Sequence, residues 1–388
     1  MMQTRRSFFC RALQLLLVTC TLYFFYATVL EKAREASWSD AVSDFVRRSL
    51  SDGVFGHIGN RTLGFEHIYA IGLEERTDKR DFMALTTAVS GFTVQWMDGV
   101  RPDELNEKAL PQGYNLTLMK PTAVGCWRAH MNALSDMLSN GYSTALILED
   151  DADWDVTLRA QLQEFAVGLH ALKGTRKISK EAPYGVDWDI LWIGGCASGP
   201  NDNETDFYAI PNDPTAPRTG HRGTWGGPLE QWKEQYPEYP EDSTRFVYRA
   251  AMGCCTYGYA VSNRGAQNVL MQLSVDHIEG AVDNAMSDLC GFHPRRTRIE
   301  CYAPFPNLVG TYRRAGSAAR DSDINVLDWD NTHGEEAWNL MYSTKMNIHR
   351  LVAGERTVYS QWDEDLPWSD RELNLDEFVY PRGHLVRG

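Results

Sequence analysis

The stretch from Ala145 to Asp155 reads ALILEDDADWD, an apolar run that ends abruptly in acidic side chains. Residues Thr144–Leu148 (TALIL) predict a short buried β-strand, because a brief continuous apolar run bounded by polar residues is typical of one. The end of that strand then carries four carboxylates close together: Glu149, Asp150, Asp151 and Asp153. Open α/β sheets bind their ligands at the edge where the strands end. The stretch therefore predicts an α/β fold and the edge that holds its site.

These four acidic side chains predict a metal site. Crowded carboxylates repel one another unless a cation lies among them, and carboxylate oxygens are the ligands that Mn²⁺ and Mg²⁺ prefer. We therefore predict that all four side chains bind one such ion. A solvated acidic turn without any ligand is the alternative that the pattern leaves open.

Segments on both sides of this strand alternate between strand and helix patterns. The predicted strands are His67–Leu73, Phe92–Met97 and Trp188–Ile193. The predicted helices are Phe82–Val89, Trp127–Asn140 and one that begins after a Ser262 cap. Strands that alternate with helices are typical of a mostly parallel sheet flanked by helices.

Cationic side chains after the first predicted strand suit a phosphate ligand. This turn holds Arg76, Lys79 and Arg80, and in a nucleotide-binding α/β fold it faces the ligand. His130 lies near the entrance of a predicted helix, where anions are favoured. We assign these four residues and Asp98 to nucleotide binding. A solvated helix start and a buried structural histidine are the alternatives.

Two aspartates are the predicted catalytic residues. Asp151 belongs to the acidic cluster, and Asp283 follows the segment Asp276–Val282 (DHIEGAV). An aspartate held beside a metal-bound nucleotide can act as a general base toward a hydroxyl group, and we assign that role to Asp283. Taken in isolation, Asp283 also fits an ordinary surface acid.

The N-terminal region predicts a single membrane span. Residues Ala12–Leu30 form an uncharged apolar run of the length that crosses a bilayer. Arginines precede this run whereas the charges after it cancel, so the positive-inside rule places residues 1–11 in the cytosol and the remaining chain in a lumen. The alternative is a cleaved signal peptide, whose apolar core is shorter. We predict a single-pass type II signal anchor in the Golgi or endoplasmic reticulum membrane.

Cysteines and glycosylation motifs agree with a luminal location. Asn60, Asn115 and Asn203 each begin an Asn-x-Thr motif, which is used only on the secretory side. Of the eight cysteines, six follow the apolar run, an even number for an oxidising compartment. The sequence does not choose among the possible pairings, and Cys290 with Cys301 is our prediction for a local pair. No Cys-x-x-Cys motif occurs, so no zinc module is expected.

The charge of the chain argues against nucleic acid as a partner. The 388 residues include 38 Lys and Arg against 52 Asp and Glu, which gives a formal net charge of −14. So acidic a chain repels phosphate backbones. An acidic surface suits a cation, or a sugar whose hydroxyl groups carboxylates can bind.

The chain divides into five predicted parts. In order they are a cytosolic tail, a transmembrane anchor, a stem, a main domain and a peripheral C-terminal extension, at residues 1–11, 12–30, 31–60, 61–330 and 331–388. Within the main domain, residues 198–241 are rich in Pro, Gly and Trp and lack a periodic pattern. We interpret this stretch as an insertion, either functional or disordered.

Several short motifs together resemble glycosyltransferase family 25, the group of bacterial lipooligosaccharide glycosyltransferases and procollagen galactosyltransferases. In chain order the motifs are Ile68–Met83, Gly125–His130, Leu148–Asp151, Trp188–Gly194, Gly258–Leu270, Val282–Asp283, Pro306–Val309 and Ser322–Ile324. The chain looks like a fungal-type member. It departs from the family where Ala129 replaces the serine of a Gly-Cys-x-x-Ser-His box.

The resemblance implies a Rossmann-like fold of the GT-A type and an enzyme that inverts the anomeric carbon. Mn²⁺ or Mg²⁺, held by the box Glu149–Asp151, would bridge the phosphates of a UDP-sugar. The cationic turn would assist with the nucleotide, and Asp283 would take the proton of an acceptor hydroxyl group. We expect galactose to be transferred to a glycan or glycoprotein, with UDP-glucose as the open alternative donor.

Two other functions remain in competition at this stage. A glycoside hydrolase also uses two carboxylates, but it needs neither a nucleotide nor a metal. A catalytically silent luminal protein with the same fold would bind carbohydrate or act like a chaperone. The intact acidic box favours the transferase, because a silent descendant has no reason to keep mutually repelling acids together.

Overall fold

The computed structural model describes most of the chain beyond residue 53. The described ranges are 54–114, 119–175, 178–223, 225–325, 327–362 and 371–388, together with Thr21, Tyr23, Tyr26 and Ala27. The predicted membrane span, apart from these four residues, and most of the predicted stem lie outside them, as does the Asn115 motif. Within the described ranges no helix combines the length and the apolar character that crossing a bilayer requires.

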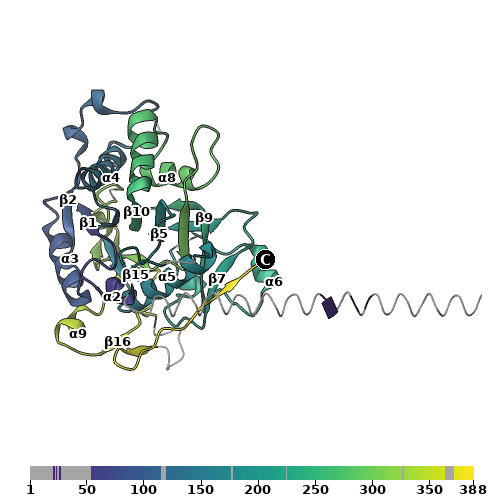
Figure 1. Cartoon of the computed structure of the whole chain (residues 1–388). Coiled ribbons are helices and arrows are strands. Elements are labelled where there is room, and N and C mark those ends of the chain that lie inside the picture. The colour runs from purple at the N-terminus through teal and green to yellow at the C-terminus, as the bar shows by residue number, and fades with distance from the viewer. Residues whose placement is uncertain are drawn as a thin grey trace, which may run out of the picture.

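One fourteen-stranded sheet forms the centre of the molecule (Figure 1). In spatial order its main path is β18 (His384–Val386), β7 (Phe207–Pro211), β9 (Thr244–Cys254), β11 (Cys301–Phe305), β5 (Ile190–Gly194), β10 (Gly258–Ser262), β3 (Thr144–Glu149), β1 (His67–Gly72) and β2 (Gln95–Asp98). Branching from this path are β4 (Ala152–Trp154), β6 (Ala197–Pro200), β8 (Trp225–Gly226), β12 (Val309–Arg313) and β15 (Glu336–Trp338). The predicted α/β class, with one large central sheet flanked by helices, is confirmed.

The three strands β3, β1 and β2, at the end of the sheet that carries the acidic stretch, are parallel. Strand β1 pairs in parallel with both β2 and β3, and β5 pairs in parallel with β11. Strand β10 runs antiparallel between β3 and β5, and β9 runs antiparallel beside β11. The register sets Ile71 opposite Glu149 and Gly72 opposite Asp98. The carboxyl ends of β1, β2 and β3 therefore meet at one edge of the sheet, and the predicted site residues lie at or just after these ends.

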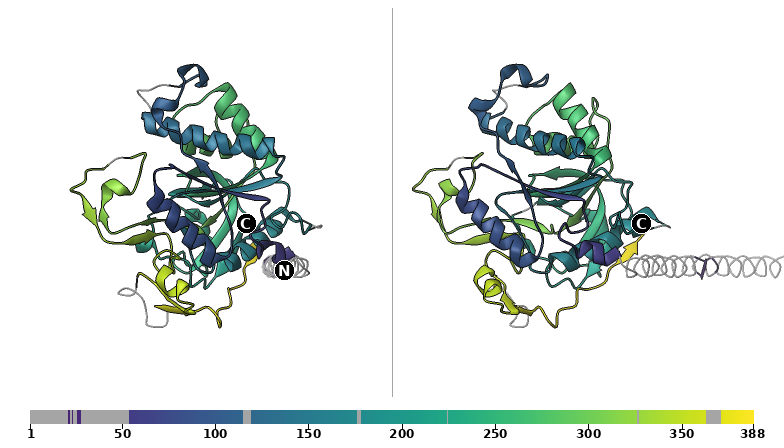
Figure 2. Two further views of the ribbon diagram at one scale, coloured as in Figure 1. Left: turned by 90° about the vertical axis from the view of Figure 1, so that its left-hand side faces the viewer. Right: turned by 60° about the vertical axis from the view of Figure 1, so that its left-hand side comes forward.

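Helices cover both faces of the sheet, because alternate side chains of the central strands are apolar on both sides. In β3, Ile147 packs into one core cluster and Leu146 into the other. The first face is covered by α4 (Pro121–Ser139), α7 (Asn263–Leu270) and α8 (Val282–Cys290), and the second by α3 (Thr77–Ser90) and α5 (Leu158–Lys173). Figure 2 shows α4 and α8 together on one side of the strands and α3 on the other.

The helices begin and end where local sequence favours it. The Ser262 hydroxyl accepts a hydrogen bond from the Gly265 N–H at the start of α7, which confirms the predicted cap. Gly91 ends α3 in the left-handed conformation, with a φ of 74°. The remaining helices and short strands are α2 (Val54–Ile58), α6 (Glu230–Gln235), α9 (Ile348–Val352), β13 (Gly316–Ser317), β14 (Thr332–His333), β16 (Thr357–Tyr359) and β17 (Glu372–Asn374).

The predicted insertion and the predicted peripheral extension are both part of the sheet. Strand β7 comes from residues 198–241, and β18, from the last residues of the chain, pairs antiparallel with it. Strand β15 pairs with β12. Strand pairing therefore joins residues on both sides of the predicted boundary at residue 330, and such pairing between distant segments leaves no pattern in the local sequence.

Two disulfides join strands and helices of the described chain. Cys290, at the end of α8, is bonded to Cys301, at the start of β11, as predicted. Cys196 is bonded to Cys255 across a sequence separation of 59 residues. Cys126 and Cys254 are free thiols.

Candidate functional site

Two neighbouring cavities open at the edge of the sheet where β1, β2 and β3 end. The first cavity is lined by residues 71–73, 99–102, the helix α4 residues Thr122, Gly125, Cys126, Ala129 and His130, the acidic box, Lys79 and residues 321–324. The second cavity is lined mainly by Arg76, Lys79, Phe82, residues 312–314, residues 319–321, Trp329 and Lys345. Asp150 and Asp151 line both cavities. These two carboxylates therefore mark the place where the cavities meet.

Glu149, the last residue of β3, turns its carboxylate toward helix α4. Its Oε1 atom accepts a hydrogen bond from the Thr256 hydroxyl and lies 3.5 Å from His130 Nε2. Burial opposes ionisation, but the interaction with His130 holds the pKa of Glu149 below its usual value. Glu149 lines the first cavity and not the second.

Asp150 and Lys79 form a buried ion pair between the two cavities. Lys79 Nζ lies 2.8 Å from Asp150 Oδ1 and 3.0 Å from Asp323 Oδ2. Burial works against the ammonium charge, yet the Asp150 and Asp151 carboxylates raise the pKa of Lys79. Gly72 makes room for this pair, since a Cβ atom there would lie 2.7 Å from the Asp150 side chain. Lys79 is thus a cation fixed at the cavity wall.

Asp151 has a buried carboxylate oxygen that lacks a protein partner. Among the described residues nothing hydrogen-bonds its Oδ1 atom. Burial, opposed by Lys79 and reinforced by Glu149, raises the pKa of Asp151 to about 7. A cation at this oxygen would offset both the burial and the repulsion between carboxylates. The residues present therefore fit a divalent ion held by Asp151 and the adjacent Asp150.

Asp153 lies apart from the other three acidic side chains. Its fully buried carboxylate accepts hydrogen bonds from the Ser343 hydroxyl and from the backbone N–H groups of Trp154, at 2.8 Å, and Lys345, at 3.2 Å. The chain enters β4 after Asp151, and this strand directs Asp153 into the packed segment 343–345 instead of a cavity. Asp153 is therefore held by protein hydrogen bonds away from both cavities, and its role as a metal ligand stays a prediction.

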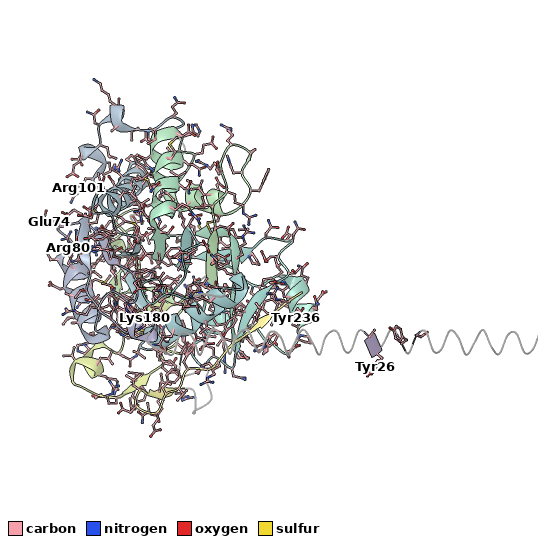
Figure 3. All side chains as sticks on the ribbon, in the orientation of Figure 1. Tyr26, Glu74, Arg80, Arg101, Lys180 and Tyr236 are labelled. Carbon is pink, nitrogen blue, oxygen red and sulfur yellow. A yellow bond between two sulfur atoms is a disulfide. The ribbon has the colours of Figure 1, made fainter. Side chains whose placement is uncertain are left out.

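Arg80 and Asp98, both assigned to nucleotide binding, bind each other instead. Arg80 also donates hydrogen bonds to the backbone carbonyls of Gly72 and Leu73, each at 3.1 Å. Neither side chain lines the first or the second cavity. Figure 3 labels Arg80 and Arg101 on the same edge of the molecule, and of these two only Arg101 lines the first cavity. Arg80 and Asp98 brace the ends of β1 and β2.

Arg76 and His130 do line the cavities. Arg76 lies in the second cavity, where it pairs with Asp78 and Asp323. His130 is fully buried at the wall of the first cavity, and its Nδ1 atom lies 3.0 Å from the Tyr259 hydroxyl oxygen. The structure thus brings Arg76, Lys79 and His130 to the same pair of cavities as the acidic box.

Asp283 is held by a backbone turn and faces neither cavity. Its Oδ2 atom accepts a hydrogen bond from the Cys255 N–H at 2.9 Å and contacts the Cys254 thiol at 3.4 Å. Cys255 has a positive φ of 57°, so this carboxylate stabilises a backbone conformation that side chains rarely adopt. Among the described residues that line the two cavities Asp283 is absent. The position does not favour the predicted role as a base.

Lys345 and Asp323 line the site, although neither was predicted as a site residue from the sequence. Lys345 is 2% exposed, lines the second cavity and lies close to the acidic box, although almost 200 residues separate them in sequence. Burial, opposed by the Asp153 and Asp151 carboxylates, lowers the pKa of Lys345. Asp323 binds Lys79 and Arg76. The motif Ser322–Ile324 was the only sequence signal for Asp323, and no sequence signal indicated Lys345.

Comparison with known proteins gives the chain's relatives. The model of glycosyltransferase family 25 (LPS biosynthesis protein) matches residues 65–180. Procollagen galactosyltransferase 1 of Danio rerio is 22% identical over 319 residues, which cover 76% of this chain and 44% of that protein. Procollagen galactosyltransferase 1-B of Xenopus laevis is also 22% identical, over 313 residues, with the same coverage. The chain therefore spans less than half the length of these relatives.

Another relative is described as lacking activity. The inactive glycosyltransferase 25 family member 3 of Homo sapiens is 23% identical over 160 residues, which cover 38% of this chain and 25% of that protein. Among solved structures, mannose-1-phosphate geranyltransferase from Thermus thermophilus aligns with a TM-score of 0.19 and 11% identity, over 61% of this chain and 73% of that one. So weak a superposition supports no argument. The family match falls on β1, α3, α4 and β3, which build the cavities, and over these residues the chain is similar to glycosyltransferase family 25.

Proposed function

We propose that this chain is a metal-dependent, inverting glycosyltransferase with a GT-A type fold. It would move a hexose from a UDP-sugar to a hydroxyl group of a glycan or glycoprotein. The observation that carries the proposal is the position of Asp150 and Asp151, at the end of β3 and between two cavities. The printed names of the procollagen galactosyltransferase relatives support galactose as the donated sugar, with UDP-glucose as the second donor to test.

The first cavity suits the nucleoside of the donor. It lies beyond the carboxyl ends of β1, β2 and β3, which is where open α/β sheets bind nucleotides. The loop after β2 packs tightly on α4 here, since a Cβ atom on Gly125 would lie 2.0 Å from the Val100 carbonyl oxygen. The wall is thus formed by close backbone contacts, as is usual for a largely preformed ligand pocket.

The acidic pair and Lys79 suit the diphosphate of the donor. Asp150 and Asp151 would hold Mn²⁺ or Mg²⁺, which when bound stabilises the negative charge of the leaving diphosphate. Lys79 is oriented by Asp150 and Asp323 at the junction of the cavities, so its ammonium group is in place before substrate arrives. The carboxylates that orient it also keep it charged at neutral pH.

The second cavity suits the transferred sugar and the acceptor. In a single displacement with inversion the acceptor hydroxyl must approach opposite the leaving group, and the second cavity adjoins the first at Asp151, with room for a second substrate. Trp329 is 67% exposed and lines this cavity, where its ring offers a flat apolar face to a sugar. The general base is not assigned, because Asp283 is held elsewhere.

A membrane location completes the proposal. The uncharged run Ala12–Leu30 and the luminal glycosylation motifs support a type II enzyme whose site lies in the Golgi or endoplasmic reticulum lumen. The disulfides Cys196–Cys255 and Cys290–Cys301 suit an oxidising compartment.

A catalytically silent carbohydrate-binding protein is the second candidate, because one relative is named inactive. The test is hydrolysis of a panel of UDP-sugars by the purified chain with Mn²⁺, with and without EDTA. Metal-dependent release of UDP from one or two donors would support the transferase. No release from any donor would favour the silent protein, and cleavage of a glycoside in EDTA without a nucleotide sugar would favour a hydrolase.

A further inference from the structure

We propose that Cys126, His130 and Glu149 form a binding site for a thiophilic divalent ion, with Zn²⁺ as the best fit. The thiol sulfur, an imidazole nitrogen and a carboxylate oxygen of these residues all lie within 4.8 Å of one another. All three side chains line the first cavity. This inference is independent of the proposed function, which places its ion at Asp150 and Asp151.

Two rigid elements hold the three ligands in place. Cys126 and His130 are one turn apart on α4, so both side chains project from the same face of the helix. Glu149 is the last residue of β3, and α4 packs directly on this strand. Because the ligands come from packed elements and not from loops, little conformational entropy is lost when an ion binds.

The histidine already has the orientation that a metal ligand needs. Its Nδ1 atom is engaged by the Tyr259 hydroxyl at 3.0 Å, and its Nε2 atom lies 3.4 Å from the Thr256 hydroxyl oxygen and 3.5 Å from Glu149 Oε1. Histidine ligands almost always use the second ring nitrogen for such a bond, which fixes the ring. The distance of 3.5 Å between His130 Nε2 and Glu149 Oε1 is close to the separation of about 3.3–3.5 Å that two such ligands have around a tetrahedral zinc ion, given Zn–N and Zn–O bonds of about 2.0–2.2 Å.

The mixture of ligand types selects the metal. A thiolate, an imidazole and a carboxylate together suit Zn²⁺, whereas Mn²⁺ and Mg²⁺ prefer oxygen ligands only. Three protein ligands leave the fourth position of a tetrahedral ion open, and here that position faces the first cavity. A water molecule or a group of the bound ligand would occupy it. On binding, the Cys126 thiol releases its proton to solvent and becomes the thiolate ligand.

The site is separate from the acidic pair at the junction of the cavities. Glu149 faces α4 and lines the first cavity alone, whereas Asp150 and Asp151 line both cavities and face Lys79 and Lys345. The absence of a Cys-x-x-Cys motif does not oppose the site. The ligands have the spacing Cys-x-x-x-His on a helix, and a strand supplies the third one.

Cobalt titration tests the site on the full-length chain, freed of metal by a chelator and kept without thiol reductants so that the disulfides persist. We expect one equivalent of Co²⁺ to give the visible bands of a tetrahedral ion and a thiolate-to-cobalt charge-transfer band, both removed by Zn²⁺. Cys126→Ser should abolish the charge-transfer band and weaken Zn²⁺ binding at least about 100-fold. Tyr259→Phe should weaken Zn²⁺ binding about 10- to 100-fold, as expected for loss of an outer-shell partner.

Matched variants keep the test decisive. Cys254→Ser removes the other free thiol among the described residues and should leave the Co²⁺ spectrum unchanged. Asp151→Asn should also leave it unchanged, so this site and the proposed catalytic ion can fail separately. If Cys126→Ser does not fold, the other two proteins decide the question. Charge-transfer bands in the unaltered chain together with weaker Zn²⁺ binding in Tyr259→Phe would support the site. A featureless Co²⁺ titration of the unaltered chain, or a charge-transfer band that survives in folded Cys126→Ser, would overturn the proposal.

Discussion

At the scale of single residues, four neighbouring acidic positions divide into different roles. Glu149 faces helix α4, Asp150 binds Lys79, and Asp151 keeps one buried oxygen without a partner in the described structure. The Asp153 carboxylate accepts hydrogen bonds from the segment 343–345. The chemistry of the cluster therefore depends on where each carboxylate points and not on the number of acids.

A pair of substitutions separates the catalytic role from the structural one. Asp151→Asn should lower the rate of sugar transfer by about 100- to 1,000-fold, which is the usual cost of losing one group that stabilises a charged transition state. The melting temperature should stay within a few degrees, since no protein hydrogen bond to Oδ1 is lost. Asp153→Asn should instead lower the free energy of unfolding by about 1–3 kcal/mol, because buried hydrogen bonds to its carboxylate are disturbed. Equal effects of the two variants on activity would contradict this division.

At the scale of elements, the site depends on a close contact between α4 and the loop after β2. A Cβ atom on Gly125 would lie 2.0 Å from the Val100 carbonyl oxygen, so Gly125→Ala must push this loop and the wall of the first cavity outward. We expect UDP affinity, measured by calorimetry, to fall at least about tenfold, which corresponds to about 1.4 kcal/mol. Gly220→Ala is the control, because its Cβ atom would meet no heavy atom within 4 Å. Unchanged affinity in Gly125→Ala would place the nucleotide elsewhere.

The segment with strands β13 and β14 carries a pH-dependent contact beside the cavities. In Figure 2 this segment projects from the rest of the molecule. The His333 ring bonds the Gly334 carbonyl and lies 2.9 Å from Asp321 Oδ2, and these contacts raise the pKa of His333 above 6.5. The stabilisation is therefore complete below pH 6.5 and is lost as the pH rises through the raised pKa. A proton NMR titration should show this raised pKa, and Asp321→Asn should return it toward 6.5. A His333 pKa at or below 6.5 in the unaltered chain would show that the contact is absent.

At the scale of the whole molecule, a buried ion pair fastens the residues predicted as an insertion to the sheet. Arg245 Nε lies 2.7 Å from Asp213 Oδ2, with side-chain exposures of 2% and 0%. Asp213→Asn leaves the guanidinium buried without its counter-ion and should lower the free energy of unfolding by about 3–5 kcal/mol in a urea titration. The exposed pair Arg356 and Asp376 is the control, and Asp376→Asn should cost less than about 1 kcal/mol. A small effect of Asp213→Asn would mean that this region is not held by the pair.

The elements that could be predicted from the sequence are those with a local apolar pattern. The strands that begin at His67 and Thr144 and the helix that contains Trp127 follow from apolar periodicity, and the acidic box marks the functional edge. The antiparallel direction of β10 and the pairing of β18 with β7 did not follow, because strand direction and partner choice are properties of the assembled sheet. The position of Lys345 at the site could not be predicted for the same reason, because it depends on packing between segments that are far apart in the sequence.

The most direct test of the account is calorimetric titration of UDP into the full-length chain with Mn²⁺, compared with the same titration of Asp151→Asn. The central claim is that the end of β3 holds a divalent ion that binds the donor's diphosphate. We predict measurable UDP binding with Mn²⁺, its loss in EDTA, and its loss in a folded Asp151→Asn variant. Equal UDP affinity in the unaltered chain and Asp151→Asn, or affinity that EDTA leaves intact, would contradict the claim.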